Sequence, residues 1–90
     1  MNIFVAELTP LVEFVENKMK EYRESDAPDR YKILGEIVAD HDKAVVLFQF
    51  SLNFHELYDS DAEFKHAMWN LSRRFAQVSG EYLYAINHDN

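Results

Sequence analysis

The sequence predicts an α+β fold, in which two helices pack on one face of a small antiparallel sheet. Apolar residues recur at helical spacing in residues 10–24 and 61–79. They alternate with other residues from 46 to 54, and a shorter alternating run follows near the C-terminus. We therefore expect a hairpin plus a C-terminal strand, in the order α-β-β-α-β, within a single domain of residues 1–90.

The first helix is predicted to begin at Thr9-Pro10, with Thr9 as the N-cap and Pro10 at the first helical position. Its apolar stripe follows a 3-4-3 spacing through Val12, Val15, Met19 and Tyr22. Residues 24–29 are polar and contain a proline, which is typical of a linker. Residues 2–7 fit either a strand or the lead-in to the helix.

Residues 31–54 fit two interpretations, a long helix or a β-hairpin. The helix would follow a heptad through Tyr31, Leu34, Val38, His41, Val45, Phe48, Leu52 and His55. It would place two histidines in the stripe and Gly35 inside the helix, at a cost of about 1 kcal/mol. The hairpin joins strands 31–39 and 44–54 through the loop 40–43, and its register puts only apolar residues and Gly35 on one face. That sorting favours the hairpin.

The second helix is predicted over residues 61–79. Asp59, Ser60 and Asp61 are N-cap candidates, and Gly80 is a candidate stop signal. The helix carries the clearest apolar stripe of the chain, through Phe64, Met68, Leu71, Phe75 and Val78. Tyr82, Tyr84 and Ile86 then alternate with other residues, which predicts the third strand.

Composition limits the function classes. The chain has 16 acidic and 9 basic residues, and residues 1–60 contain twelve and six of them. Such an acidic chain is not expected to bind nucleic acid directly, because phosphate contacts need a basic face. It has no cysteine, no signal-peptide pattern at its start and no apolar run near the roughly 20 residues of a membrane span. We therefore expect a cytoplasmic protein that does not bind membranes.

Short motifs give no catalytic or metal-binding assignment. We interpret His41-Asp42 as turn residues within the hairpin loop. Glu63-x-x-His66 has the spacing of a carboxylate-bridged di-iron helix, but such a site needs a second copy of the motif. The acidic cluster around Asp59 and Asp61 is explained by helix-start electrostatics. We therefore expect no cofactor, no metal and no enzymatic activity, and a metal-dependent enzyme ranks third.

The sequence is interpreted as a small acidic interaction protein that binds and modulates or inhibits a partner with a basic surface. In one form it would mimic nucleic-acid charge toward a DNA-binding protein or nuclease, as small antagonists from phages or mobile elements do. The expected partner-binding residues are Glu13, Glu16, Glu24, Asp26 and Asp29. The alternative is a structural or regulatory homodimer whose charge serves only solubility.

Two apolar features predict protein contacts. The back face of the expected sheet would carry Leu34, Val38, Val45 and Leu47, and four such residues favour self-association as a homodimer. Trp69 lies one position beyond the stripe of the second helix, near Arg73. Because tryptophan is enriched at interfaces, it is a candidate interface anchor.

Overall fold

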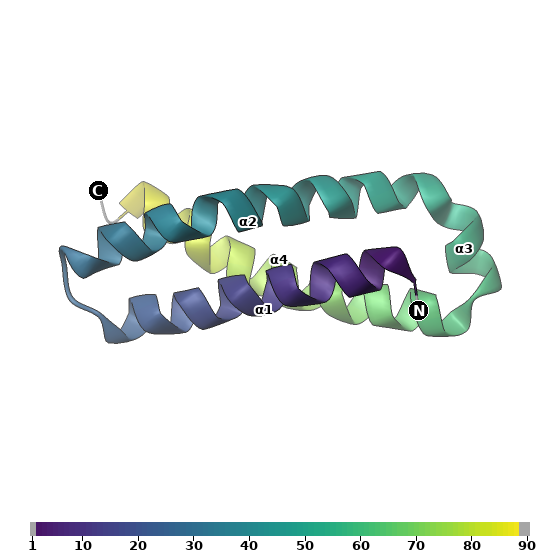
Figure 1. Ribbon diagram of the computed structural model, residues 1–90, viewed down its shortest axis with the longest axis horizontal. Helices are drawn as coiled ribbons and strands as arrows, with labels where there is room; N and C mark the ends of the chain where they lie inside the picture. The colour runs from purple at the N-terminus through teal and green to yellow at the C-terminus, as the bar shows by residue number, and fades with distance from the viewer. Residues whose placement is uncertain (1, 89–90) are drawn as a thin grey trace.

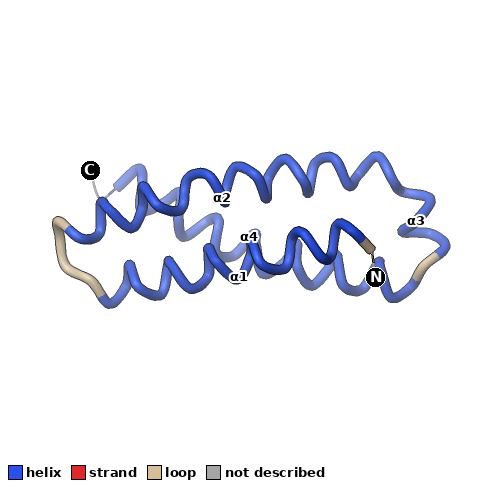
Figure 2. The backbone as a smooth tube through the Cα atoms, in the orientation of Figure 1, coloured by secondary structure: helices blue, strands red, loops and turns tan. Residues whose placement is uncertain are grey.

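The computed structural model describes residues 2–88, and within that range it contains helices and no strand (Figures 1 and 2). Three long helices, α1 (Ile3–Glu24), α2 (Asp29–Ser51) and α4 (Ala62–His88), run alongside one another. They form a rod with extents of 47 × 18 × 17 Å. The predicted α+β fold and its antiparallel sheet are therefore wrong, since the described chain is all-α.

The connection between α2 and α4 closes one end of the rod. It consists of a 3-10 turn, η1 (Leu52–Phe54), and a short helix, α3 (His55–Ser60). At the other end, α1 and α2 are joined by residues 25–28, where the linker was predicted. There the Nε of Arg30 donates to the carbonyl of Ser25 at 2.6 Å, and its guanidinium lies over the Tyr22 ring.

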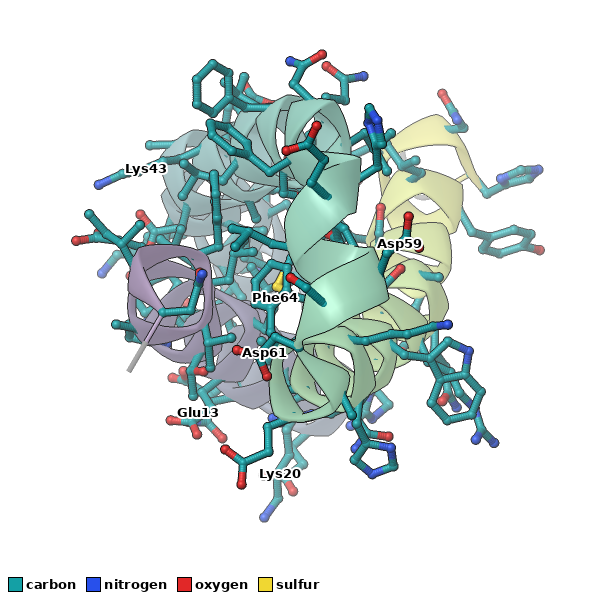
Figure 3. All side chains as sticks on the ribbon, turned by 90° about the vertical axis from the view of Figure 1, so that its right-hand side faces the viewer. Glu13, Lys20, Lys43, Asp59, Asp61 and Phe64 are labelled. Carbon is teal, nitrogen blue, oxygen red and sulfur yellow. The ribbon has the colours of Figure 1, made fainter. Side chains whose placement is uncertain are left out.

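All three long helices contribute to one apolar core. Its fully buried centre is formed by Leu8, Val12, Val15, Met19, Ile37 and Ala44. On α4 the buried residues keep a strict 4-3-4-3-4-3 spacing: Phe64, Met68, Leu71, Phe75, Val78, Tyr82 and Ala85. Figure 3, viewed from the α3 end, shows Phe64 near the middle of the bundle, with Glu13, Lys20 and Lys43 on the outside.

Helix α1 begins earlier than the predicted start at Thr9-Pro10. The side chain of Asn2 accepts a hydrogen bond from the Phe4 N–H at 2.8 Å and caps the helix, so most of the undecided segment 2–7 is helical. Pro10 therefore lies inside the helix, at a cost of about 3 kcal/mol. Burial of Phe4 and Leu8 offsets this cost, at roughly 1.5–3 kcal/mol for each side chain.

The predicted hairpin over residues 31–54 is wrong, because α2 is a helix through Asp40–Lys43. Apart from Ile33, the residues of α2 that face the core follow a 3-4 spacing: Leu34, Ile37, His41, Ala44, Phe48 and Ser51. Three residues of this row are polar or small, so the stripe is weak in the sequence. Large apolar residues such as Val46 and Phe50 are instead more than half exposed, and they produced the alternation that resembles a strand.

Helix α4 begins as predicted and ends later. The Oδ1 of Asp61 accepts a hydrogen bond from the Phe64 N–H at 3.1 Å, which confirms Asp61 as a capping residue. The predicted stop at Gly80 and the predicted strand after it are wrong, because α4 continues to His88. Gly80 keeps a negative φ, and burial of Tyr82 and Ala85 outweighs the roughly 1 kcal/mol that a helical glycine costs.

Candidate functional site

The five residues predicted to bind a partner divide into two groups. Glu13, Glu24, Asp26 and Asp29 are exposed and form no ion pair within residues 2–88; we name these four the acidic surface. Glu16 differs, because its carboxylate accepts two hydrogen bonds from Arg74, at 2.6 and 3.1 Å. That hydrogen bonding raises the pKa of Arg74. The structure thus assigns Glu16 to the contact between α1 and α4.

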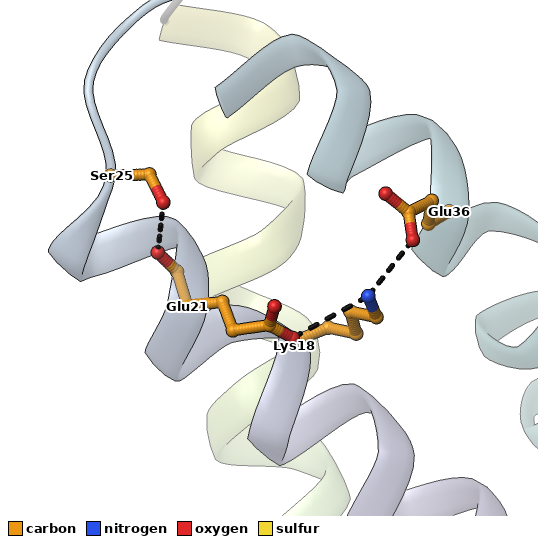
Figure 4. Close-up of polar contacts among 4 residues, drawn as sticks. All are labelled: Lys18, Glu21, Ser25 and Glu36. Atoms are coloured by element: carbon orange, nitrogen blue, oxygen red, sulfur yellow. Dashed lines mark hydrogen bonds and ion pairs between the residues drawn. The ribbon is translucent and has the colours of Figure 1, made fainter. Parts of the chain in front are cut away.

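Ion pairs join α1 to both of its neighbours. Figure 4 shows Lys18 between Glu21 and Glu36. Its Nζ donates to Glu36 of α2 at 2.8 Å and lies 3.4 Å from Glu21. This hydrogen bond lowers the pKa of Glu36 and raises the pKa of Lys18. Arg23 likewise pairs with Glu81 of α4. Several of the acids are therefore paired along α1, while those of the acidic surface form no ion pair in the described chain. Glu13 interacts with a base only at longer range, since its charge also raises the pKa of Arg74.

The junction between α2 and α4 is built differently, around a buried histidine. The His41 Nε2 lies 2.7 Å from the Ser79 Oγ, and the imidazole packs against the rings of Phe75 and Tyr82 at centroid distances of 5.1 and 4.7 Å. His41 is only 6% exposed. The interpretation of His41-Asp42 as turn residues is therefore wrong, since His41 belongs to the core of a helix.

Ser79, His41 and Asp42 have the residue types of a nucleophile-base-acid triad, but not its geometry. The His41 Nδ1 and the Asp42 Oδ1 are 3.8 Å apart, too far for the hydrogen bond that orients the imidazole in such a triad. Ser79 lies within α4, where its backbone N–H is part of the helical hydrogen-bond ladder and is not directed at an oxyanion. We interpret the His41–Ser79 hydrogen bond as structural.

Beside this junction lies a long, weakly charged surface. On α2 it follows a 4-3 spacing through Tyr31, Gly35, Val38, Asp42, Val45 and Gln49, and it continues to Leu52 at the start of η1. On α4 it follows a similar spacing through Lys65, Trp69, Ser72, Ala76, Ser79 and Leu83. All of these residues are exposed or half-buried, and together we name them the α2–α4 face. Helical periodicity places both rows on the side where α2 meets α4.

A surface pocket of about 390 Å³ lies at the α3 end of the α2–α4 face. It is lined mainly by Phe48 of α2, by Leu52 of η1, and by Met68 and Trp69 of α4. Trp69, the predicted interface anchor, is 56% exposed here, and the Arg73 guanidinium lies 5.3 Å from its ring centroid. The structure therefore places the one tryptophan of the chain at the edge of an apolar depression.

The four residues predicted for self-association do not form one patch. Val38 and Val45 lie on the α2–α4 face. Leu34 is buried in the core, and Leu47 lines a separate apolar pocket of about 430 Å³ between the start of α1 and the end of α2. Phe4, Phe50 and Phe54 line the same pocket, with ring centroids 5.3–6.1 Å apart. The patch predicted from the sheet thus separates into two surfaces of the helix.

The remaining motif residues lie near the α3 end. Glu63 and His66 are exposed on the first two turns of α4, and Asp61 serves as the cap described above. Among residues 2–88, no group of three or more His, Cys, Asp or Glu side chains is placed to hold a metal ion. The same part of the chain contains no helix that is both long and apolar enough to cross a membrane.

Sequence reasoning missed the link between His41 and Ser79 and the row of exposed residues on α4. The alternative interpretation of residues 31–55 as a helix contained a signal for the His41–Ser79 contact, because its heptad includes His41. Its members Leu34, His41 and Phe48 do face the core, while Val38, Val45 and Leu52 lie on the α2–α4 face.

Comparison with protein-family models, curated proteins and solved structures gives no match to this chain, so the evidence for its function comes from these surfaces alone.

Proposed function

We propose that this chain is a non-catalytic interaction protein whose acidic surface binds and modulates a partner protein with a basic surface. The observation that carries the proposal is the division of the acids into paired and unpaired groups. Glu16, Glu36 and Glu81 are neutralised within the bundle, whereas Glu13, Glu24, Asp26 and Asp29 are exposed without an ion pair in the described chain.

The glutamates of the acidic surface point to one side of the bundle. Glu13 and Glu24 are separated by three helical turns, so they lie on the same outward side of α1. Asp26 follows α1 in the connection, Asp29 begins α2, and both are exposed at that end of the bundle. Lys20 lies on the same side of α1 as Glu13 (Figure 3), and helical periodicity places it between Glu13 and Glu24. A basic partner would be steered to this side by long-range attraction.

The size of the charge identifies the kind of partner. The chain carries a net charge of −7 on a rod 47 Å long. Double-stranded DNA of that length would carry about 28 charges, at one per roughly 1.7 Å. The protein therefore suits a local basic patch on a partner better than a site that recognises the full charge density of a nucleic acid. As part of the proposal we place the protein in the cytoplasm, since a chain without cysteine needs no oxidising compartment.

The test combines charge reversal with affinity capture from the native host, followed by quantitative mass spectrometry at low and high salt. The variant Glu13→Lys/Glu24→Lys should lose the captured partner, and Lys20→Glu should capture more of it. The matched control is Glu56→Lys/Asp59→Lys, which changes the net charge equally at the α3 end and should capture normally.

Salt provides the second readout, because contacts between exposed charges weaken as the Debye length falls below its physiological value of about 8 Å. We expect wild-type capture to decline at high salt and the capture by Lys20→Glu to decline more steeply. A captured partner that is insensitive to salt and to both Glu13→Lys/Glu24→Lys and Lys20→Glu would contradict the proposal.

A further inference from the structure

The α2–α4 face has the spacing of a helix-packing surface, although most of its residues are exposed in the described chain. Each helix carries a second row of residues at 3-4 spacing, next to the row that faces the core. Such a row meets another helix when two bundles pack side by side. Val38, Leu52, Trp69 and Leu83 are between 45% and 70% exposed on these rows.

Gly35 lies on the same surface and, having no side chain, leaves room for a neighbouring backbone to approach α2 closely. A Cβ built there would meet nothing within 4 Å. A glycine inside a helix costs about 1 kcal/mol relative to alanine. The monomer gains no packing or turn geometry in return, because the glycine has no positive φ. A neighbouring backbone that packs against α2 would account for it.

Charge points to a second copy as the occupant. Two chains that each carry −7 repel one another unless they meet where acids are few. The α2–α4 face contains one acid, Asp42, and one base, Lys65, with Arg73 beside Trp69 at its edge. It is thus neutral to slightly basic on an acidic molecule, and Asp42 of one copy can be attracted to Lys65 or Arg73 of the other. Two copies that meet here keep α1 and its acids apart.

A dimer contact would have to extend along most of the bundle. The outline of one whole side of the bundle measures 47 by 18 Å, or about 850 Å². A standard specific interface buries roughly 800 Å² on each partner. The pocket of about 390 Å³ beside Trp69 adds a depression that can receive an apolar side chain from the second copy.

We propose that the protein forms a homodimer through the α2–α4 face, with Trp69 buried at the contact and the acidic surface directed outward. This inference goes beyond the proposed function, because it assigns a different surface and a different partner. It needs only the purified chain, so the failure of one proposal leaves the other intact.

The first test is the mass of the purified protein in sedimentation equilibrium over a range of concentrations. Wild type should show a monomer–dimer equilibrium. Val38→Glu and Leu83→Glu place an acid on the α2–α4 face, and each should weaken association at least tenfold while the helical circular-dichroism signal is retained. The control Ile3→Glu makes the same kind of change at a side chain that is 68% exposed on α1, and it should dimerise as wild type does.

The second test uses the intrinsic fluorescence of Trp69, the single tryptophan of the chain, and requires no variant to fold. Dilution of wild type should shift the emission to longer wavelength and increase quenching by acrylamide as the exposed monomer forms. Three results would overturn the inference: a monomeric mass at every concentration, emission that does not change on dilution, or a dimer lost in Ile3→Glu and kept in folded Val38→Glu.

Discussion

The two junctions that α1 makes with its neighbours differ in kind from the junction between α2 and α4. Along α1, exposed ion pairs cross to each neighbour, through Lys18–Glu36 and Arg74–Glu16. Between α2 and α4 the described polar contact is that of the buried His41 with Ser79, and the surface beside it carries few charges and an apolar pocket. The difference indicates that the charged side of the bundle faces solvent or a polar partner, while the other side suits close packing.

Among substitutions at these junctions, His41→Ala is expected to lower the stability of the protein the most. The substitution removes a ring that packs between Phe75 and Tyr82 and leaves the Ser79 hydroxyl without that partner. A cavity and a lost buried hydrogen bond together should cost about 2–4 kcal/mol of unfolding free energy. Urea unfolding followed by circular dichroism measures this cost, with the exposed His66→Ala as the control. A loss below about 0.5 kcal/mol, the usual size of a surface substitution, would show that His41 does not hold the two helices together.

A smaller change in the free energy of unfolding, of opposite sign, is expected when the glycines are replaced by alanine. Gly80→Ala adds a methyl group in open space on a helix with negative φ, so it should stabilise the monomer by about 0.5–1 kcal/mol. Gly35→Ala should give a similar gain in the monomer and should also weaken dimerisation, because Gly35 lies on the α2–α4 face. Equal dimerisation in wild type and Gly35→Ala would remove the glycine from the proposed contact.

The ion pairs along α1 should contribute less. Arg74→Ala removes an exposed pair, and such pairs are worth about 0.2–1 kcal/mol. The loss should shrink at high salt, unlike the loss from His41→Ala. Thermal unfolding of Arg74→Ala and His41→Ala at low and high salt compares the two kinds of junction. A salt-independent loss of more than about 2 kcal/mol of unfolding free energy in Arg74→Ala would contradict this expectation.

The smallest expected effect is on the stability of the protein at alkaline pH. Burial raises the pKa of Tyr82 above its ordinary value of 10.0, and the carboxylate of Asp42 acts in the same direction. The folded state therefore retains the phenol proton more firmly than the unfolded state does. The associated stability is fully present below pH 10 and is lost as pH rises through the folded-state pKa. Tyr82→Phe should flatten this alkaline decline, whereas the exposed Tyr84→Phe should not; equal slopes in both would contradict the assignment.

The sequence predicted those parts of the fold where apolar side chains make up the stripe. Residues 10–24 and 61–79 were identified as helices for that reason, and both are confirmed as parts of longer helices. Pro10 and Gly80 were wrong boundaries, because their local cost is outweighed by buried side chains farther along the same stripe.

Helix α2 could not be identified in the same way. Its core positions include His41, Ala44 and Ser51, while Val46 and Phe50 face outward. A buried histidine becomes favourable only when Ser79, distant in the sequence, supplies its hydrogen-bond partner. The patch assigned to Leu34, Val38, Val45 and Leu47 depended on the wrong strand register, and only Val38 and Val45 share a surface in the helix. The exposure of the predicted acidic residues could be inferred from the sequence, because it depends on no tertiary contact. Glu16 is the exception, because its carboxylate pairs with Arg74.

The central claim is that the α2–α4 face packs against another copy while the α1 side remains in solvent. The most direct test is a dilution series of amide NMR spectra of the wild-type protein. We predict that the signals that shift with concentration cluster around Val38, Val45, Ser72 and Leu83, and that those of Glu13 and Lys20 do not move. Shifts concentrated on α1, or none at any concentration, would contradict the account.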